Sequence, residues 1–235
     1  VDGSVDPVRD KEIIDFELQL KDLESIEKNI GALARKAKSG DKDAIRQHEV
    51  FEAAKNHLEA GNSIRSLDVD KEKMALLDEL HLLTAKPVLY LCNVDEASVK
   101  DGNNYVKAVR EAVKGEDAEV LILGAAIEAD INELDTYEER QMFLDDLGLE
   151  EPGVSKLISS AYKLLKLQTY FTAGVKEVRA WTINLGMTAP QAAGVIHTDF
   201  EKGFIRAEVI HYNDFVEFGS EAKCKEVGKL NIEGK

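Results

Sequence analysis

The sequence predicts an α/β protein in which a helical hairpin precedes a parallel sheet and a small α+β module follows it. Three observations support this fold class. Apolar residues recur with a helical period over residues 10–38 and 42–60. Two short apolar runs, 88–92 and 119–123, alternate with helical patterns, as buried parallel strands do. From residue 168 onward, short alternating stretches indicate the strands of a compact module.

The predicted hairpin consists of one helix over residues 10–38 and a second over residues 42–60. Between them, Gly40 is suited to a C-cap and Asp41 to the N-cap of the second helix. Two such helices form an antiparallel pair with coiled-coil character. A third helix is predicted over residues 70–84. The inward-facing stripes are Phe16, Leu20, Leu23, Ile30, Ala34 and Ala37 in the first helix, and Met74, Leu77, Leu80 and Leu83 in the third.

Asn93 directly follows the first buried strand, predicted over residues 87–92. It therefore lies at the carboxyl end, where open α/β sheets bind their ligands. An asparagine there can pair with the N6/N7 edge of a purine, donating to one atom and accepting from the other. Glu96, three residues on, would complete a base-reading loop. Because N-x-x-E is also common in ordinary loops, this assignment depends on support from the rest of the chain.

The second strand, residues 119–123, ends in the small residues Gly124, Ala125 and Ala126, and a helix is predicted over residues 128–146. Small residues let the backbone approach a ligand closely, although a tight strand-to-helix turn needs them equally. A helix over residues 101–114 connects the two strands. This order implies right-handed crossovers and a parallel sheet.

The remaining residues are predicted to form a helical stretch and then the α+β module. Residues 145–167 are helical, with breaks at Gly148 and Pro152. Strands are predicted over 170–174, 178–183 and 203–210, and a helix over 189–197.

With a net charge of −15, the chain as a whole is expected not to bind nucleic acid non-specifically, because such binding needs clustered cations. Residues 168–235, with 8 basic and 9 acidic side chains, are the least acidic part. Their cations form either local basic patches or a solvated surface. No apolar run is long enough to span a bilayer. Cys92 and Cys224 lack metal-ligand spacing, and the expected location is the reducing cytoplasm.

The chain resembles the YchF/Obg-like ATPase family of P-loop proteins over essentially its whole length. The stretch His197–Ala207 is the most specific of the matching motifs. The others are Val5–Asp10, Lys86–Glu96, Ala125–Ala129, Leu167–Gly174 and Arg179–Thr182.

This resemblance implies a domain organisation. Residues 1–15 and 86–166 would belong to a Ras-like nucleotide-binding domain, interrupted by a helical hairpin domain at residues 16–85. Residues 167–235 would form a TGS domain, a ubiquitin-like β-grasp module. The family's TGS domain normally has one more strand, so the sequence is expected to be a piece of a longer protein.

The resemblance also implies a function. Members hydrolyse ATP, often in preference to GTP, and the expected role is a Mg²⁺-dependent molecular switch in translation or the stress response. The nucleotide-binding residues would be Asn93, Val94, Glu96, Gly124, Ala125 and Ala126, with Val94 packing on the base and the small residues closing over it. The N-K-x-D loop of GTPases becomes N-x-x-E, and a glutamate need not adopt the geometry with which aspartate accepts from guanine.

The sequence contains no G-x-x-x-x-G-K-[ST] motif, so the catalytic residues and the Mg²⁺ ligands are expected outside it. The 235 residues alone are therefore expected not to hydrolyse ATP. The expected partner is the ribosome or RNA, bound through the hairpin and the TGS domain, with no DNA or membrane partner. The alternative is a non-enzymatic RNA- or ribosome-binding module built from the same two parts, and a dimerising helical protein is a third reading.

Overall fold

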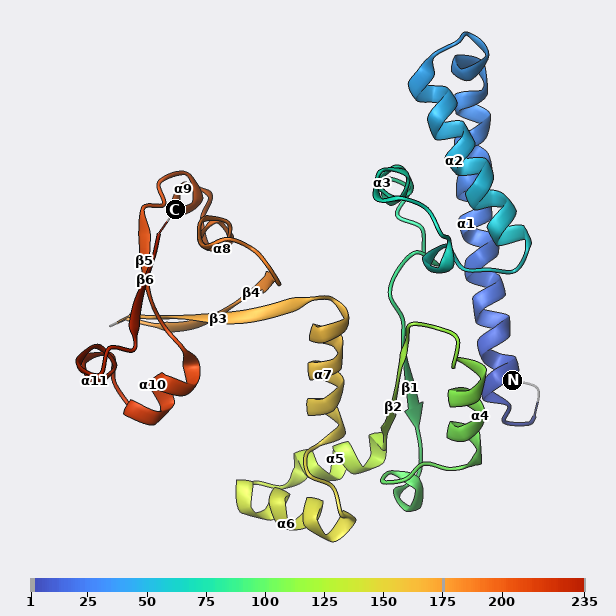
Figure 1. Cartoon of the computed structure of the whole chain (residues 1–235). Coiled ribbons are helices and arrows are strands. Elements are labelled where there is room, and N and C mark those ends of the chain that lie inside the picture. The colour runs from blue at the N-terminus through green and yellow to red at the C-terminus, as the bar shows by residue number, and fades with distance from the viewer. Residues whose placement is uncertain (1–2, 175, 235) are drawn as a thin grey trace. The chain divides into compact units, whose positions relative to one another are not determined.

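The structure is a computed structural model that describes residues 3–174 and 176–234, and it divides into two compact units (Figure 1). Residues 1–2, 175 and 235, which fall in the predicted ranges 1–15 and 167–235, lie outside the described residues. Unit 1 ends at Leu164 and unit 2 begins at Leu165. The described part of the chain has no helix long and apolar enough to cross a membrane.

Unit 1 contains the hairpin, a two-stranded parallel sheet and the helices around it. Short 3-10 turns occur at Ile64–Ser66 and Glu96–Ser98. The other elements are α1 (Pro7–Lys38), α2 (Lys42–Glu59), α3 (Lys71–Asp78), β1 (Leu89–Asn93), α4 (Asn104–Ala112), β2 (Glu119–Leu123), α5 (Ala125–Glu133), α6 (Tyr137–Leu147) and α7 (Gly153–Leu164).

Helices α1 and α2 form the long hairpin seen in Figure 1. α1 begins three residues before the predicted helix, because the Asp6 side chain accepts from the Arg9 N–H and Pro7 follows it. The predicted stripe of α1 is wrong in its N-terminal half, where Phe16 is 60% exposed and Leu20 is 44% exposed. The side chains of α1 that are buried instead are Asp22 and Ile26. The hairpin core is formed by Ile26, Val50, Phe51, Ala54, Leu58, Ile64, Leu77 and Leu82.

Asp22 is a buried carboxylate that joins α1 to the segment leading into β1. Its two oxygens accept from the backbone N–H groups of Leu83 and Thr84 and from the Thr84 hydroxyl, each at 2.7 Å. The Thr84 hydroxyl oxygen in turn accepts from the Ile64 N–H at 3.1 Å. A buried carboxylate is tolerated only when it is hydrogen-bonded in this way. The position of this segment is therefore set by α1.

The same contact explains why the third helix is shorter than predicted. α3 ends at Asp78, and His81 then adopts a left-handed φ of 51°. The N–H groups of Leu83 and Thr84 bond to Asp22 and so cannot continue a helix. Leu82 is buried in place of Leu83, which is 37% exposed.

The sheet of unit 1 pairs β1 with β2 in parallel, with Asn93 beside Leu123 in the register. α4 contacts both α1 and β2, and its side chains Val106 and Val109 are buried. α7 also contacts β2. The first two N–H groups of α7, those of Gly153 and Val154, donate to the buried Glu128 carboxylate of α5.

The helix predicted over residues 128–146 is two helices, α5 and α6. Leu134 is extended, and Thr136 starts α6 with a reciprocal capping box to Glu139. The sequence Thr-x-x-Glu was the signal for this break. α6 ends at Gly148, which is left-handed as expected of a C-cap glycine.

Unit 2 contains two antiparallel strand pairs and four short helices within the described residues. The predicted strands and the capping-box helix after Thr188 are present. The last strand and three short helices were not predicted, because they are too short to show a clear period. The elements are β3 (Leu167–Ala173), β4 (Val178–Asn184), α8 (Ala189–Ile196), α9 (Thr198–Lys202), β5 (Arg206–Ile210), α10 (Tyr212–Phe218), α11 (Glu221–Glu226) and β6 (Leu230–Gly234), with β3 paired to β4 and β5 to β6.

A second polar contact joins α1 to the sheet. The Lys11 ammonium donates to Asp15 at 2.6 Å and lies 2.8 Å from Glu116, and the Tyr90 hydroxyl donates to Glu116 at 2.7 Å. Burial alone would lower the pKa of Lys11, but its hydrogen bonds to Asp15 and Glu116 outweigh this and raise the pKa. Burial and the bond to Glu116 raise the pKa of Tyr90 to about 12. Burial would raise the pKa of Glu116, but the bonds from Lys11 and Tyr90 lower it.

We expect Asp22→Ala to destabilise unit 1 strongly. Three donors lose their acceptor, and each buried unsatisfied donor costs about 1–3 kcal/mol, so the free energy of unfolding should fall by about 3 kcal/mol or more. Urea unfolding followed by far-UV circular dichroism measures this. Glu17→Ala, an exposed site on the same helix, is the control and should change stability by no more than about 0.5 kcal/mol. Equal effects of the two substitutions would contradict the role of Asp22.

We expect Glu116→Gln to lower the free energy of unfolding at neutral pH. The loss should be smaller at acid pH. A carboxyl group whose pKa is lowered in the folded state stabilises it above the unfolded pKa, about 4.3, and this contribution is lost as the pH falls through the folded pKa. Urea midpoints of the two proteins should therefore converge below about pH 4. The control Glu24→Gln, which removes an exposed ion pair with Lys21, should leave stability nearly unchanged.

Candidate functional site

The candidate site lies at the edge of the sheet where β1 and β2 both end. β1 ends at Asn93 and β2 at Leu123, and these residues are partners in the parallel register. The loop that starts at Val94 and the turn at Gly124 therefore leave the sheet side by side. This carboxyl edge is where open α/β sheets bind ligands.

Two hydrogen bonds connect the loop after β1 to the turn after β2. The Val94 N–H donates to the Leu123 carbonyl oxygen at 2.9 Å. The Ala125 N–H donates to Oδ1 of Asn93, also at 2.9 Å. Because Gly124 supplies no side-chain cap, Asn93 satisfies the first N–H of α5 from another strand. The two predicted halves of the site are thus in direct contact.

This contact uses the acceptor of the Asn93 side chain. The residue is exposed, and its Nδ2 group is a donor without a hydrogen-bond partner among the described residues. The structure therefore favours Asn93 as a donor to a ligand. Pairing of Asn93 with both the N6 and the N7 positions of a purine stays a prediction.

Close packing explains the glycine at the start of α5. Gly124 is buried, and a Cβ atom there would lie 2.9 Å from Cδ1 of Ile127 and 3.4 Å from the Val94 carbonyl oxygen. Ala125 and Ala126 are exposed, so small side chains border the open side of the turn. The side chains of this turn, at the edge of the sheet, are therefore small.

The other predicted residues lie on the same loop. Val94 is half-buried, and Glu96 is exposed in the first position of the 3-10 turn that follows Asp95. Neither side chain has a hydrogen-bond or ion-pair partner within the described residues. Both remain available to a ligand, and their roles stay predictions.

The site shows no chemistry of its own. Burial raises the pKa of the Cys92 thiol, the residue before Asn93, so it is not a thiolate at neutral pH. Nowhere in residues 3–174 and 176–234 do three His, Cys, Asp or Glu side chains gather as a metal site. The edge presents to solvent the Asn93 amide, the Glu96 carboxylate and the small side chains of Ala125 and Ala126.

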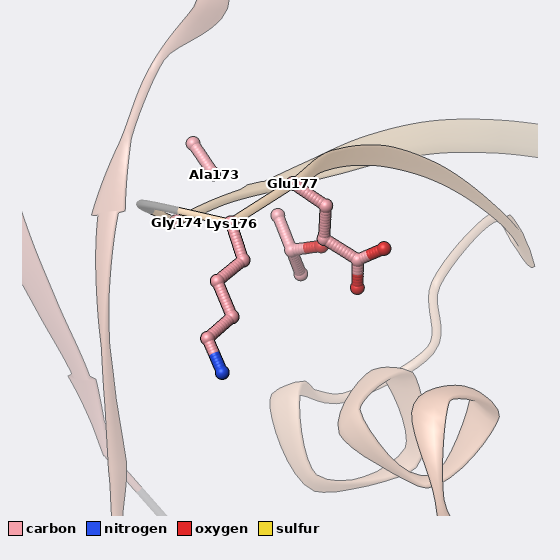
Figure 2. A pocket seen from close by; sticks show the side chains of 5 residues that line it. Ala173, Gly174, Lys176 and Glu177 are labelled. Atoms are coloured by element: carbon pink, nitrogen blue, oxygen red, sulfur yellow. The ribbon is translucent and has the colours of Figure 1, made fainter.

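Two surface pockets lie away from the sheet edge. One, of about 340 Å³, lies beside the β3–β4 turn and is lined by five residues of that hairpin, Lys176 and Glu177 among them (Figure 2). Its lining has no aromatic ring on which a base could stack. The other, of about 220 Å³, lies between Phe16 of α1 and Leu58 of α2. Neither borders Asn93 or Gly124, so we assign neither to the candidate site.

Comparison with known proteins identifies relatives across the whole chain. "Ribosome-binding ATPase YchF" of Bacillus subtilis is 48% identical over 237 residues, and its counterpart in Escherichia coli O157:H7 is 51% identical over 235 residues, in both cases with 100% of this chain covered. The solved structure of the Schizosaccharomyces pombe YchF GTPase is 35% identical, with a TM-score of 0.87 over 100% of this chain.

The chain belongs to the YchF family. The α/β fold predicted from the sequence is confirmed by the match to the YchF structure. The family model YchF-GTPase_C, described as a protein of unknown function, matches residues 167–235. These are the residues predicted to form the TGS domain, but the description names no fold for them.

The YchF relatives are longer than this chain. It spans 64% of the length of the B. subtilis and E. coli proteins and 64% of the S. pombe structure. The ATPase and GTPase names belong to those proteins.

Proposed function

We propose that the chain supplies the base-binding edge of a nucleotide-dependent switch that hydrolyses ATP, with GTP as the weaker substrate. The observation that carries this proposal is the bond from the Ala125 N–H to Asn93, which joins the two predicted binding loops at the carboxyl edge of the sheet. The names of the relatives, ribosome-binding ATPase and YchF GTPase, support the activity.

In this proposal the residues of the edge bind the purine from several sides. Asn93 Nδ2 donates to N7, an acceptor that adenine and guanine share. Val94 packs on one face of the base, while Gly124, Ala125 and Ala126 leave room for its other side. Glu96 selects against guanine, because its longer side chain does not reproduce the aspartate contact to N1–H and N2–H₂.

The nucleotide's Mg²⁺ is part of the proposal, but the described residues do not form a site for it. Magnesium is commonly held by one or two carboxylates together with nucleotide phosphates. It supplies charge neutralisation on the phosphates when bound. The phosphate-binding and catalytic residues of the proposed switch are not assigned to this chain, whose role is to bind and orient the base.

We also propose the domain division 1–15 and 86–166 for nucleotide binding, 16–85 for the hairpin and 167–235 for a TGS domain. The hairpin and the C-terminal module would contact the ribosome, which places the protein in the cytoplasm. The names of the relatives support the ribosome as partner.

We expect Asn93→Ala in the full-length protein to weaken ATP and GTP binding alike. The substitution removes the donor to N7 and the cap of Ala125, and loss of about 1 kcal/mol or more corresponds to about five- to tenfold in Kd. Isothermal titration calorimetry with each nucleotide measures it. Asn103→Ala is the matched control, since Asn103 also accepts from a backbone N–H, that of Val106, but lies outside the loop. Unchanged affinity for both nucleotides would sink the base-binding assignment.

We expect Glu96→Asp to move nucleotide preference toward GTP. An aspartate can accept from both guanine donors, and a two-point contact to a base edge discriminates by about 1–3 kcal/mol, so the ratio of the two affinities should change by about tenfold or more. Competition titrations of ATP against GTP measure the ratio. Glu111→Asp, on the exposed side of α4, should leave it unchanged. A ratio that Glu96→Asp does not alter removes Glu96 from the site.

A further inference from the structure

The turn of the α1–α2 hairpin carries a cluster of unpaired cations. We define the hairpin tip as residues 35–42, where α1 ends, the chain turns and α2 begins. Its eight residues include four cations and one carboxylate, whereas the whole chain has 30 basic and 45 acidic side chains. All four cations are exposed, and none has an ion-pair partner among the described residues. They are Arg35, Lys36, Lys38 and Lys42.

Several cations elsewhere on the hairpin form ion pairs with carboxylates. Lys21 pairs with Glu24 at 2.8 Å, and Lys55 pairs with Glu27 at 2.9 Å. The single carboxylate of the tip, Asp41, accepts from the backbone N–H groups at the start of α2. The tip is therefore a local positive patch on an acidic protein.

Helix stability explains only part of this pattern. Three of the cations lie in the last turn of α1, where positive charge is favourable for the helix dipole. Lys42, however, is the first residue of α2, where positive charge is unfavourable. Its presence beside the other three favours a role in binding over a role in folding.

The tip is far from the acidic part of unit 1. Lys11, which contacts Glu116, lies near the N-terminal end of α1, and Lys38 is the last residue of α1. At 1.5 Å per residue, about 40 Å of helix separates Lys11 from Lys38. Figure 1 shows the α1–α2 turn at the end of the hairpin away from β1 and β2. Charges are screened within about 8 Å at physiological ionic strength. The carboxylates around the sheet therefore do not cancel the attraction of the tip for an anion.

The chemistry of the tip fits phosphate better than a protein surface. Between its cations the tip has only Ala37, Ser39 and Gly40 besides Asp41. Protein interfaces depend on aromatic or apolar anchors, which these residues do not provide. Clustered exposed lysines and arginines instead bind nucleic acid by displacing its counterions.

We propose that the hairpin tip contacts the phosphate backbone of RNA. This inference rests on the proposed ribosome-associated function and names the surface that would touch ribosomal RNA. It does not require base recognition, since phosphate contacts carry no sequence information directly.

The test is binding of the full chain to a fluorescein-labelled RNA duplex over a salt series. The tip variant replaces all four cations by glutamine. A matched control removes the same charge from exposed lysines outside the tip. A third variant, Lys36→Arg with Lys38→Arg and Lys42→Arg, keeps the charge. The control substitutions are Lys21→Gln, Lys73→Gln, Lys107→Gln and Lys114→Gln.

We expect the tip variant to lose about tenfold or more in affinity and to lower the slope of log K against log salt by about 3, close to 0.7–0.9 for each lost phosphate contact. The lysine control and the arginine variant should retain the original affinity and slope. Circular dichroism confirms that all variants fold. An unchanged slope in the tip variant, or no RNA binding by the unsubstituted chain, overturns the proposal.

Two further binding measurements, with ribosomes and with lipid vesicles, distinguish a failure of the tip proposal from a failure of the proposed function. Cosedimentation of the full-length protein with ribosomes should fall with the tip variant, while its ATP affinity stays unchanged. Tip-dependent binding to phosphatidylserine vesicles but not to RNA would overturn the RNA assignment. Conversely, if Asn93→Ala leaves nucleotide binding intact while the tip variant loses RNA, the base-binding assignment fails and the tip proposal stands.

Discussion

The buried carboxylate of Asp22 is the constraint on which the arrangement of unit 1 depends. It accepts three hydrogen bonds from Leu83 and Thr84, about 60 residues away in sequence, and these residues lead directly into β1. Because a buried charge requires such partners, the helix and the strand cannot move independently without breaking them. The Lys11–Glu116–Tyr90 contact adds a second attachment on the same helix. The hairpin is thus held at two points to the sheet that ends in Asn93.

A second consequence concerns Asn93, which has a structural role as well as a proposed binding role. Its oxygen caps α5 and its nitrogen is free to meet a ligand. A ligand that accepts from Nδ2 would also orient Oδ1 toward Ala125, so binding and the register of the two loops are coupled.

The distribution of charge gives the two ends of unit 1 different chemistry. The sheet end has an uncharged amide and small side chains suited to the edge and faces of a base. The tip of the hairpin has exposed cations suited to phosphate, and the distance between the ends is several screening lengths. The overall charge of −15 therefore does not describe the tip.

Much of the fold followed from local pattern. The two hairpin helices, both parallel strands, the capping-box helix after Thr188 and the place of Asn93 at a strand's end are determined by periodicity and capping within a few residues, which the sequence shows directly. The tertiary structure alone decided which face of α1 is buried, where α3 ends and which atom of Asn93 is occupied. Each of these depends on a hydrogen bond or a packing contact between residues 32 to 62 positions apart, and no local pattern encodes such a contact. The break between α5 and α6 is the exception, because the capping box of Thr136 and Glu139 joins residues only three positions apart and is therefore encoded locally.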